Sequence, residues 1–119
     1  MNNAADFYRA KLEFEIDAAD VHDALANGDI IVVDARTAAS YERAHVPGAI
    51  NFPHREMNEE TVQRLPKDKL IVTYCDGIGC NASTKAALKL TTFGFRVKEM
   101  PGGIDWWIRD GHAAIGCGC

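Results

Sequence analysis

The sequence predicts a three-layer α/β/α domain, in which helices cover both faces of a central, mainly parallel sheet of about five strands. Two continuous apolar runs, residues 30–33 and 70–74, have the length and β-branched composition of strands buried on both faces. Segments with helical spacing separate the expected strands, which is the pattern of βαβ units. With 119 residues, 47% of them hydrophobic, the chain is long enough for one domain with one core.

The chain begins with an alternating segment and a well-marked helix. Residues 11–16 alternate apolar and charged side chains, as a half-exposed or edge strand does. Asp17 is the kind of residue that caps the first turn of a helix, and Val21 belongs to the apolar face of that helix. Asn27 and Gly28 then end it, because glycine tolerates the left-handed backbone that often follows a helix.

The first central strand, residues 30–33, leads into the sequence Asp34-Ala35-Arg36. Thr37 can cap the short helix that follows. Residues 45–48 (His-Val-Pro-Gly) have turn-forming composition, and residues 49–52 are expected to form a further short strand.

The second half of the chain continues the alternation of helix and strand. Residues 58–65 are expected to form a helix that Pro66 ends, and residues 70–74 form the next buried strand. Residues 83–92 place apolar side chains on helical spacing, and Gly94 stands where that helix should end.

One more strand and one more helix complete the expected domain. Residues 96–100 alternate as a strand does, and residues 101–103 (Pro-Gly-Gly) turn into a final helix. Two aromatic pairs, Phe7-Tyr8 and Trp106-Trp107, could belong to the core or to a contact surface, and we expect the core.

Composition restricts the class of protein. We expect one domain at residues 11–112, with a loosely attached N-terminal extension (residues 1–10) and a short, equally loose cysteine-containing tail (residues 113–119). The net charge of −4 and the scattered Lys and Arg residues offer no basic surface for nucleic acid. No apolar stretch approaches the roughly 20 residues of a membrane span, and the first residues lack signal-peptide character. We therefore expect a cytoplasmic protein without nucleic acid or membrane partners.

The most informative residue is Cys75, which follows an expected strand and opens a glycine-containing loop ahead of a helix. Backbone N–H groups in such a loop and in the first helical turn lack intrahelical partners, and the helix dipole adds positive potential. These groups predict a lowered pKa for the Cys75 thiol. Ligands of parallel sheets bind at the carboxyl ends of strands, where both Asp34 and Cys75 are expected. The candidate binding loop consists of Asp76, Gly77, Ile78, Gly79, Asn81, Ala82 and Ser83.

Four short motifs are spread over most of the chain. They are Asp34-Ala35-Arg36, the run from His45 to Asn51 (His-Val-Pro-Gly-Ala-Ile-Asn), Tyr74-Cys75, and Gly102-Gly103-Ile104 followed by Trp107. In these motifs the chain resembles a single-domain rhodanese-like sulfurtransferase.

The resemblance implies that Cys75 is the catalytic nucleophile. It would take a sulfane sulfur from a small donor, carry it as a persulfide inside a loop of inward-pointing amides, and pass it to a thiol acceptor, which can be a protein thiol. The resemblance also implies that Asp34 and Arg36 support the loop, and we expect a structural role for His45. It calls for no cofactor and no metal.

The loop departs from the rhodanese pattern at its closing arginine. Rhodaneses commonly read Cys-x-x-x-x-Arg followed by Ser or a small residue, and an alignment anchored at Cys75 places Cys80 at the arginine position. Anchored on the following helix, the alignment places Ala82 there and lengthens the loop by two residues. Neither alignment leaves an Arg or Lys between Cys75 and Ser83. An anionic donor would then depend on amides, the dipole and Lys85, so thiosulfate turnover is expected to be weak.

The second thiol, Cys80, leaves several functions open. It can resolve a Cys75 persulfide or sulfenic acid by forming a disulfide, or it can simply fill space at the helix start. Cys117 and Cys119 extend this relay if the tail reaches the loop. The alternatives are a sulfurtransferase or persulfide carrier, a thiol redox module that cycles a Cys75–Cys80 disulfide, and a non-catalytic rhodanese-like binding module. A four-thiolate zinc site is a further alternative, although its spacings depart from short zinc knuckles.

Overall fold

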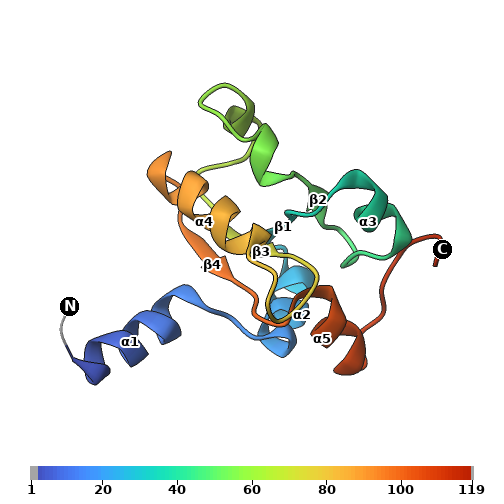
Figure 1. Cartoon of the computed structure of the whole chain (residues 1–119), viewed down its shortest axis with the longest axis horizontal. Helices are drawn as coiled ribbons and strands as arrows, with labels where there is room; N and C mark the ends of the chain where they lie inside the picture. The colour runs from blue at the N-terminus through green and yellow to red at the C-terminus, as the bar shows by residue number, and fades with distance from the viewer. Residues whose placement is uncertain (1–2, 119) are drawn as a thin grey trace.

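A computed structural model describes residues 3–118 of the chain. Its centre is a parallel four-stranded sheet in the order β2-β1-β3-β4 (Figure 1). The central pair is β1 (Ile30–Asp34) and β3 (Leu70–Tyr74), and the edges are β2 (Ile50–Asn51) and β4 (Val97–Glu99). The expected α/β fold with a parallel sheet is confirmed.

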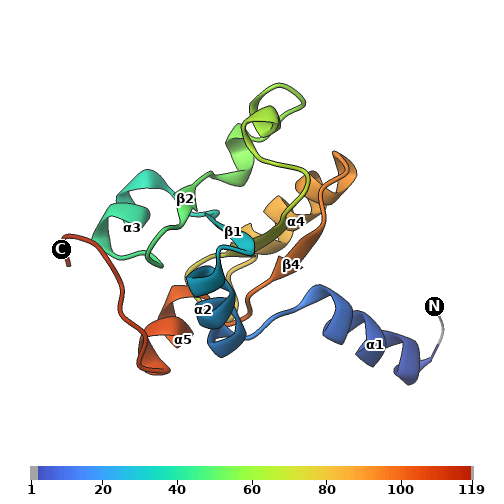
Figure 2. The same ribbon diagram turned by 180° about the vertical axis from the view of Figure 1, so that it is seen from behind.

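Helices lie on both faces of the sheet (Figures 1 and 2). The apolar faces of α2 and α5 pack on one side, and α4 packs on the other with two 3-10 turns, η1 and η2. Within residues 3–118, no helix has the length and apolar character needed to cross a bilayer. The bounds are α1 (Ala4–Phe14), α2 (Ala18–Asn27), α3 (Ala38–Arg43), η1 (His54–Glu56), η2 (Thr61–Arg64), α4 (Ala82–Thr92) and α5 (Gly103–Arg109).

The two central strands supply side chains to both halves of the core. Val32 and Val72 join the cluster that includes α2 and α5, whereas Val33 and Ile71 join the cluster that includes Leu90 of α4. All five side chains are at most 1% exposed. Burial on both faces explains why these strands read as continuous apolar runs instead of alternating ones.

The N-terminal segment is helical, so the edge strand expected at residues 11–16 is wrong. The segment is rich in Ala, Lys, Leu and Glu, which favour helix, and the Asn3 side chain caps α1 by accepting the Asp6 N–H at 2.9 Å. Within 11–16, Glu15 makes one β-bridge, to Glu99. The sheet therefore has four strands instead of about five, and α1 extends away from the layers without burying any residue (Figure 2).

The helix expected at residues 58–65 is also wrong, because only Thr61–Arg64 forms a single 3-10 turn. The Asn58 side chain accepts two following backbone N–H groups at 2.9 Å each, a local pattern that competes with the α-helix. Val62 and Leu65 are each 4% exposed. These two positions are apolar because they are buried, and their spacing in the sequence resembles that of a helix.

The tail is held against the domain, which corrects its expected loose attachment. Ile115 and His45 exchange backbone hydrogen bonds of 2.7 and 2.9 Å as an antiparallel bridge. The N–H groups of Cys117 and Gly118 donate to carbonyl groups at the end of α3, at 2.9 Å each. The thiol relay predicted for Cys117 and Cys119 includes Cys119, which lies outside the described residues.

Of the two aromatic pairs, only one residue belongs to the core. Trp107 is 1% exposed, whereas Trp106, Phe7 and Tyr8 are 50, 49 and 60% exposed. The core prediction is wrong for these three, because α1 leaves the domain and adjacent residues of α5 point in different directions.

Candidate active site

The carboxyl ends of β1 and β3 lie side by side, because Asp34 pairs with Tyr74 in the sheet register. Asp34 is completely buried. Its carboxylate accepts hydrogen bonds from the Tyr74 hydroxyl at 2.6 Å and from the Arg36 side chain at 2.7 and 3.0 Å. The Arg36 backbone N–H adds a further bond of 3.0 Å. A buried carboxylate with this many donors anchors the end of β1.

Arg36 extends this anchor to the loop. Its side chain is 7% exposed and forms a second ion pair, of 3.3 Å, with Asp76, the residue after Cys75. Burial alone would lower the pKa of Arg36, but the hydrogen bond and charge of Asp34 outweigh burial and raise it. The Asn51 amide donates to the Arg36 carbonyl at 2.9 Å. These contacts join the end of β1 to the loop that follows Cys75.

The N-terminus of α5 holds the same part of the loop. The N–H groups of Ile104 and Asp105 donate to the carbonyl oxygens of Cys75 and Asp76 at 3.0 Å each. Gly103 permits this approach, because its φ is +55° and an added Cβ would lie 2.1 Å from the Cys75 carbonyl oxygen. Any side chain at position 103 would separate α5 from the loop.

The outer part of the loop turns sharply and faces solvent. Ile78 at its tip is 96% exposed. Gly79 has a φ of +94°, and the Cys80 N–H donates to the Gly77 carbonyl at 3.2 Å. Asn81 precedes α4, but its side chain makes no capping hydrogen bond. The strand-to-helix loop expected between Cys75 and Ser83 is therefore present.

Cys75 is 2% exposed and is the first member of a hydrogen-bonded chain. Its Sγ lies 3.3 Å from Ser83 Oγ, and the Ser83 hydroxyl donates to Glu99 Oε2 at 2.8 Å. The Ser83 backbone N–H also donates to the sulfur. The Cys75 thiol itself donates to the Cys80 carbonyl oxygen at 3.3 Å.

Cys80 is half-buried, and its thiol shares a hydrogen bond with the Cys75 thiol. The backbone N–H groups of Ala82 and Asp76 donate to the Cys80 sulfur. Both cysteines are free thiols. The inward-pointing backbone N–H groups expected around Cys75 therefore serve both sulfur atoms: one donates to Cys75 and two donate to Cys80.

The acidities of the two thiols differ from the sequence-based prediction. Burial raises the pKa of Cys75, and the hydrogen bond with Cys80 raises it further. Burial also acts to raise the pKa of Cys80, but the hydrogen bond with Cys75 and the amides of Ala82 and Asp76 outweigh it and lower that pKa. The lowered pKa predicted for Cys75 is wrong because desolvation exceeds the effect of its donors. The first thiolate of the pair forms on Cys80.

Sequence reasoning missed Glu99, which meets the helix start from β4. Its carboxylate also accepts the Thr84 hydroxyl at 2.7 Å. Glu99 is the last residue of β4, so the rule that pointed to Asp34 and Cys75, the carboxyl ends of parallel strands, could have found it. His45, in contrast, stacks on Tyr41 with ring centroids 3.7 Å apart, in agreement with a structural role.

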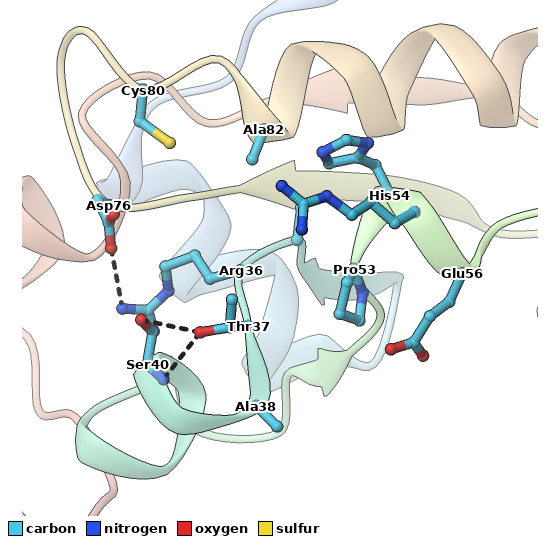
Figure 3. A pocket seen from close by; sticks show the side chains of 12 residues that line it. Arg36, Thr37, Ala38, Ser40, Pro53, His54, Glu56, Asp76, Cys80 and Ala82 are labelled. Atoms are coloured by element: carbon cyan, nitrogen blue, oxygen red, sulfur yellow. Dashed lines mark hydrogen bonds and ion pairs between the residues drawn. The ribbon is translucent and has the colours of Figure 1, made fainter.

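Two cavities open beside the loop. The smaller, about 210 Å³, is lined by Cys75, Glu99 and Cys80, among others. The larger, about 360 Å³, is lined by Cys80, Arg36 and residues of η1 (Figure 3). Within residues 3–118, no three His, Cys, Asp or Glu side chains converge as metal ligands. The four-thiolate zinc hypothesis includes Cys119, which lies outside that range.

Comparison with known proteins assigns the family. The family model described as the rhodanese-like domain matches residues 17–110. The chain belongs to this family. Among rhodanese-like relatives, a sulfurtransferase of Allochromatium vinosum is 32% identical over 98 residues, which cover 82% of this chain and 90% of that protein.

Some rhodanese-like relatives are much longer than this chain. An HTH-type transcriptional regulator of Mycobacterium tuberculosis is 34% identical over 80 residues, covering 67% of this chain and 35% of the regulator. A tRNA sulfurtransferase of Desulfurococcus amylolyticus is 35% identical over 77 residues, covering 65% of this chain and 14% of that enzyme. The chain therefore spans only about a third or less of these two relatives.

Solved structures share the rhodanese-like fold. The BH2092 protein from Bacillus halodurans is 45% identical and superposes with a TM-score of 0.88, covering 97% of this chain and 85% of that chain. A thiosulfate sulfurtransferase from Pseudomonas aeruginosa matches with a TM-score of 0.75 at 21% identity, covering 89% of this chain and 20% of that chain, a likeness of fold alone.

Proposed function

We propose that this domain is a sulfurtransferase that carries sulfur as a persulfide on Cys75. The main support is the placement of a thiol where β3 enters its loop, with the Ser83 amide directed at the sulfur and a cavity of about 210 Å³ beside it. A small sulfur donor fits that cavity, and the Ser83 amide stabilises charge on the reacting sulfur.

Proton transfer within the thiol pair can prepare Cys75 for attack. The pair shares one hydrogen bond, and its negative charge forms first on Cys80. Transfer of the Cys75 proton to the Cys80 thiolate yields Cys75–S⁻ and Cys80–SH. The Cys75 thiolate then attacks the outer sulfur of a donor, for example glutathione persulfide, which gives Cys75–S–SH and releases the glutathione thiolate.

A specific observation favours a second step at Cys80. The hydrogen bond between the two thiols places Cys80 beside the sulfur that becomes persulfidated. The Cys80 thiolate can attack the inner sulfur of Cys75–S–SH, forming the Cys75–Cys80 disulfide and releasing HS⁻. The domain would then reduce sulfane sulfur to sulfide, and a thiol reductant would restore both cysteines.

The proposed cycle has consequences for donor choice and for cellular location. The loop carries no Arg or Lys between Cys75 and Ser83, so a dianion such as thiosulfate is expected to react more slowly than glutathione persulfide. Both cysteines must be reduced at the start of each cycle, which suits the reducing cytoplasm.

The test is the intact mass of reduced protein, with peptide mapping, after brief exposure to thiosulfate or glutathione persulfide. We expect one added sulfur atom on Cys75, none in the Cys75→Ser variant, and a longer-lived adduct in the Cys80→Ser variant. An unmodified Cys75 with both donors would exclude sulfur transfer and leave the non-catalytic binding module. An adduct equally stable with and without Cys80 would exclude the resolving step alone.

A further inference from the structure

The two cavities beside the loop share a single lining residue, Cys80. Cys75 lines only the smaller cavity, whereas Arg36 and Arg55 line only the larger one. A molecule in the larger cavity therefore meets the Cys80 sulfur and does not meet Cys75. In Figure 3 the Cys80 side chain extends from the loop toward the start of α4 at Ala82.

The larger cavity has a cation in its lining, Arg55, and two lysines near it. Arg55 is exposed, and the described residues offer it no ion pair or hydrogen bond. His54, also in the lining, has a pKa lowered by burial and by the charges of Lys85, Lys89 and Arg55, so each of these cations lies near His54. The Lys89 ammonium is held there by a 2.7 Å bond to the His54 carbonyl.

The acidic residues of the same cavity do not cancel this charge. Asp76 is paired with Arg36, whose other partner is Asp34. Glu56 lies on the opposite side of the view from Cys80 in Figure 3. Of the three cations near His54, Arg55 lines this cavity itself, whereas Lys85 and Lys89 lie outside its lining on α4. Arg55 thus supplies a guanidinium from η1 to a cavity beside a loop that carries no arginine of its own.

We propose that the larger cavity binds a small thiol that carries a carboxylate, and that Arg55 directs this thiol to Cys80. The inference rests on the Cys80 step of the proposed function. A cavity of about 360 Å³ lies within the size range of small-molecule sites. The donor and the reductant would thus approach the loop from two different cavities and meet different sulfur atoms.

The reaction in this cavity is a thiol–disulfide exchange. The bound thiolate R–S⁻ attacks Cys80 of the Cys75–Cys80 disulfide, which forms R–S–S–Cys80 and releases the Cys75 thiolate. A second R–S⁻ attacks the R sulfur of this mixed disulfide, forming R–S–S–R and releasing the Cys80 thiolate. Two thiols are oxidised for each disulfide reduced.

The cavity can be tested without any persulfide, in a Cys75→Ser background that leaves Cys80 as the loop thiol. The measurement is the rate at which Cys80 forms a mixed disulfide with oxidised glutathione, which carries carboxylates, or with hydroxyethyl disulfide, which is neutral. Arg55→Gln is compared with Arg9→Gln, which removes the same charge from α1, where the arginine side chain is 74% exposed.

We expect Arg55→Gln to slow the reaction with oxidised glutathione about two- to fivefold, the range of one partly exposed charge pair. The neutral disulfide should react at an unchanged rate, Arg9→Gln should have no effect, and high salt should remove the difference. Equal rates for Arg55→Gln and Arg9→Gln would overturn the inference, as would equal slowing of both disulfides. Neither result would affect persulfide formation on Cys75, which the mass measurement tests separately.

Discussion

Replacement of Asp34 by asparagine should destabilise the domain strongly while preserving its shape. The carboxylate accepts five hydrogen bonds: Oδ1 from the Arg36 N–H and Nε, and Oδ2 from Arg36 Nη2, the Tyr74 hydroxyl and, at 3.3 Å, Arg36 Nε. An amide NH₂ in either orientation faces at least two donors. The change therefore loses at least two bonds and leaves the Arg36 charge, 7% exposed, with Asp76 as its ion-pair partner.

Removal of one partner from a buried ion pair costs about 3–5 kcal/mol. At this chain length 1 kcal/mol corresponds to roughly 4 °C, so Asp34→Asn should lower Tm by about 12–20 °C. Urea unfolding followed by far-ultraviolet circular dichroism measures the loss. Asp23→Asn is the matched control, because Asp23 is 81% exposed, and it should change stability by less than about 0.5 kcal/mol. A loss below about 1 kcal/mol for Asp34→Asn at an unchanged m-value would refute the assigned anchoring role.

Three further predictions concern the loop. Glu99→Gln should lower the pKa of Cys75, because it removes the negative charge that holds the Ser83 proton. Alkylation of Cys75 at pH 7 should then be about three- to tenfold faster. An unchanged pH profile of alkylation would contradict the hydrogen-bonded chain. Gly103→Ala should reduce both persulfide formation and the stability of the fold, because the added Cβ would lie 2.1 Å from the Cys75 carbonyl oxygen. A fully active variant would show that α5 need not hold the loop. In the wild-type protein, Cys80 should be alkylated at lower pH than Cys75, because the pKa of Cys80 is lowered and that of Cys75 is raised. Peptide mapping after alkylation at pH 6–10 measures the order. The opposite order would assign the first thiolate to Cys75.

Local sequence signals predicted most of the sheet and the placement of its site. The runs 30–33 and 70–74 are buried on both faces, so their composition alone identifies strands. Asp17 and Thr37 cap the expected helices, with side-chain acceptors bonded to backbone N–H groups. The carboxyl ends of β1 and β3 then had to share an edge, which placed Asp34 and Cys75 together.

The features that were predicted wrongly depend on three-dimensional contacts, which a single sequence does not reveal. Residues 11–16 alternate in a way that suits either a strand or an exposed helix, and only the absence of a paired strand decides between them. The acidity of Cys75 depends on desolvation and on how loop amides are shared with Cys80, both of which follow from three-dimensional placement. Glu99 reaches Ser83 only because β4 lies next to β3 in the sheet order.

The attachment of α5 to the loop gives the domain a built-in optical reporter. The helix that bonds to the Cys75 and Asp76 carbonyl groups also carries both tryptophans, one buried and one half exposed. A change in loop geometry on persulfidation or disulfide formation would move the first turn of α5 and alter the solvation of the Trp106 indole. Intrinsic fluorescence should therefore follow the sulfur cycle in real time, without a label and without unfolding the protein.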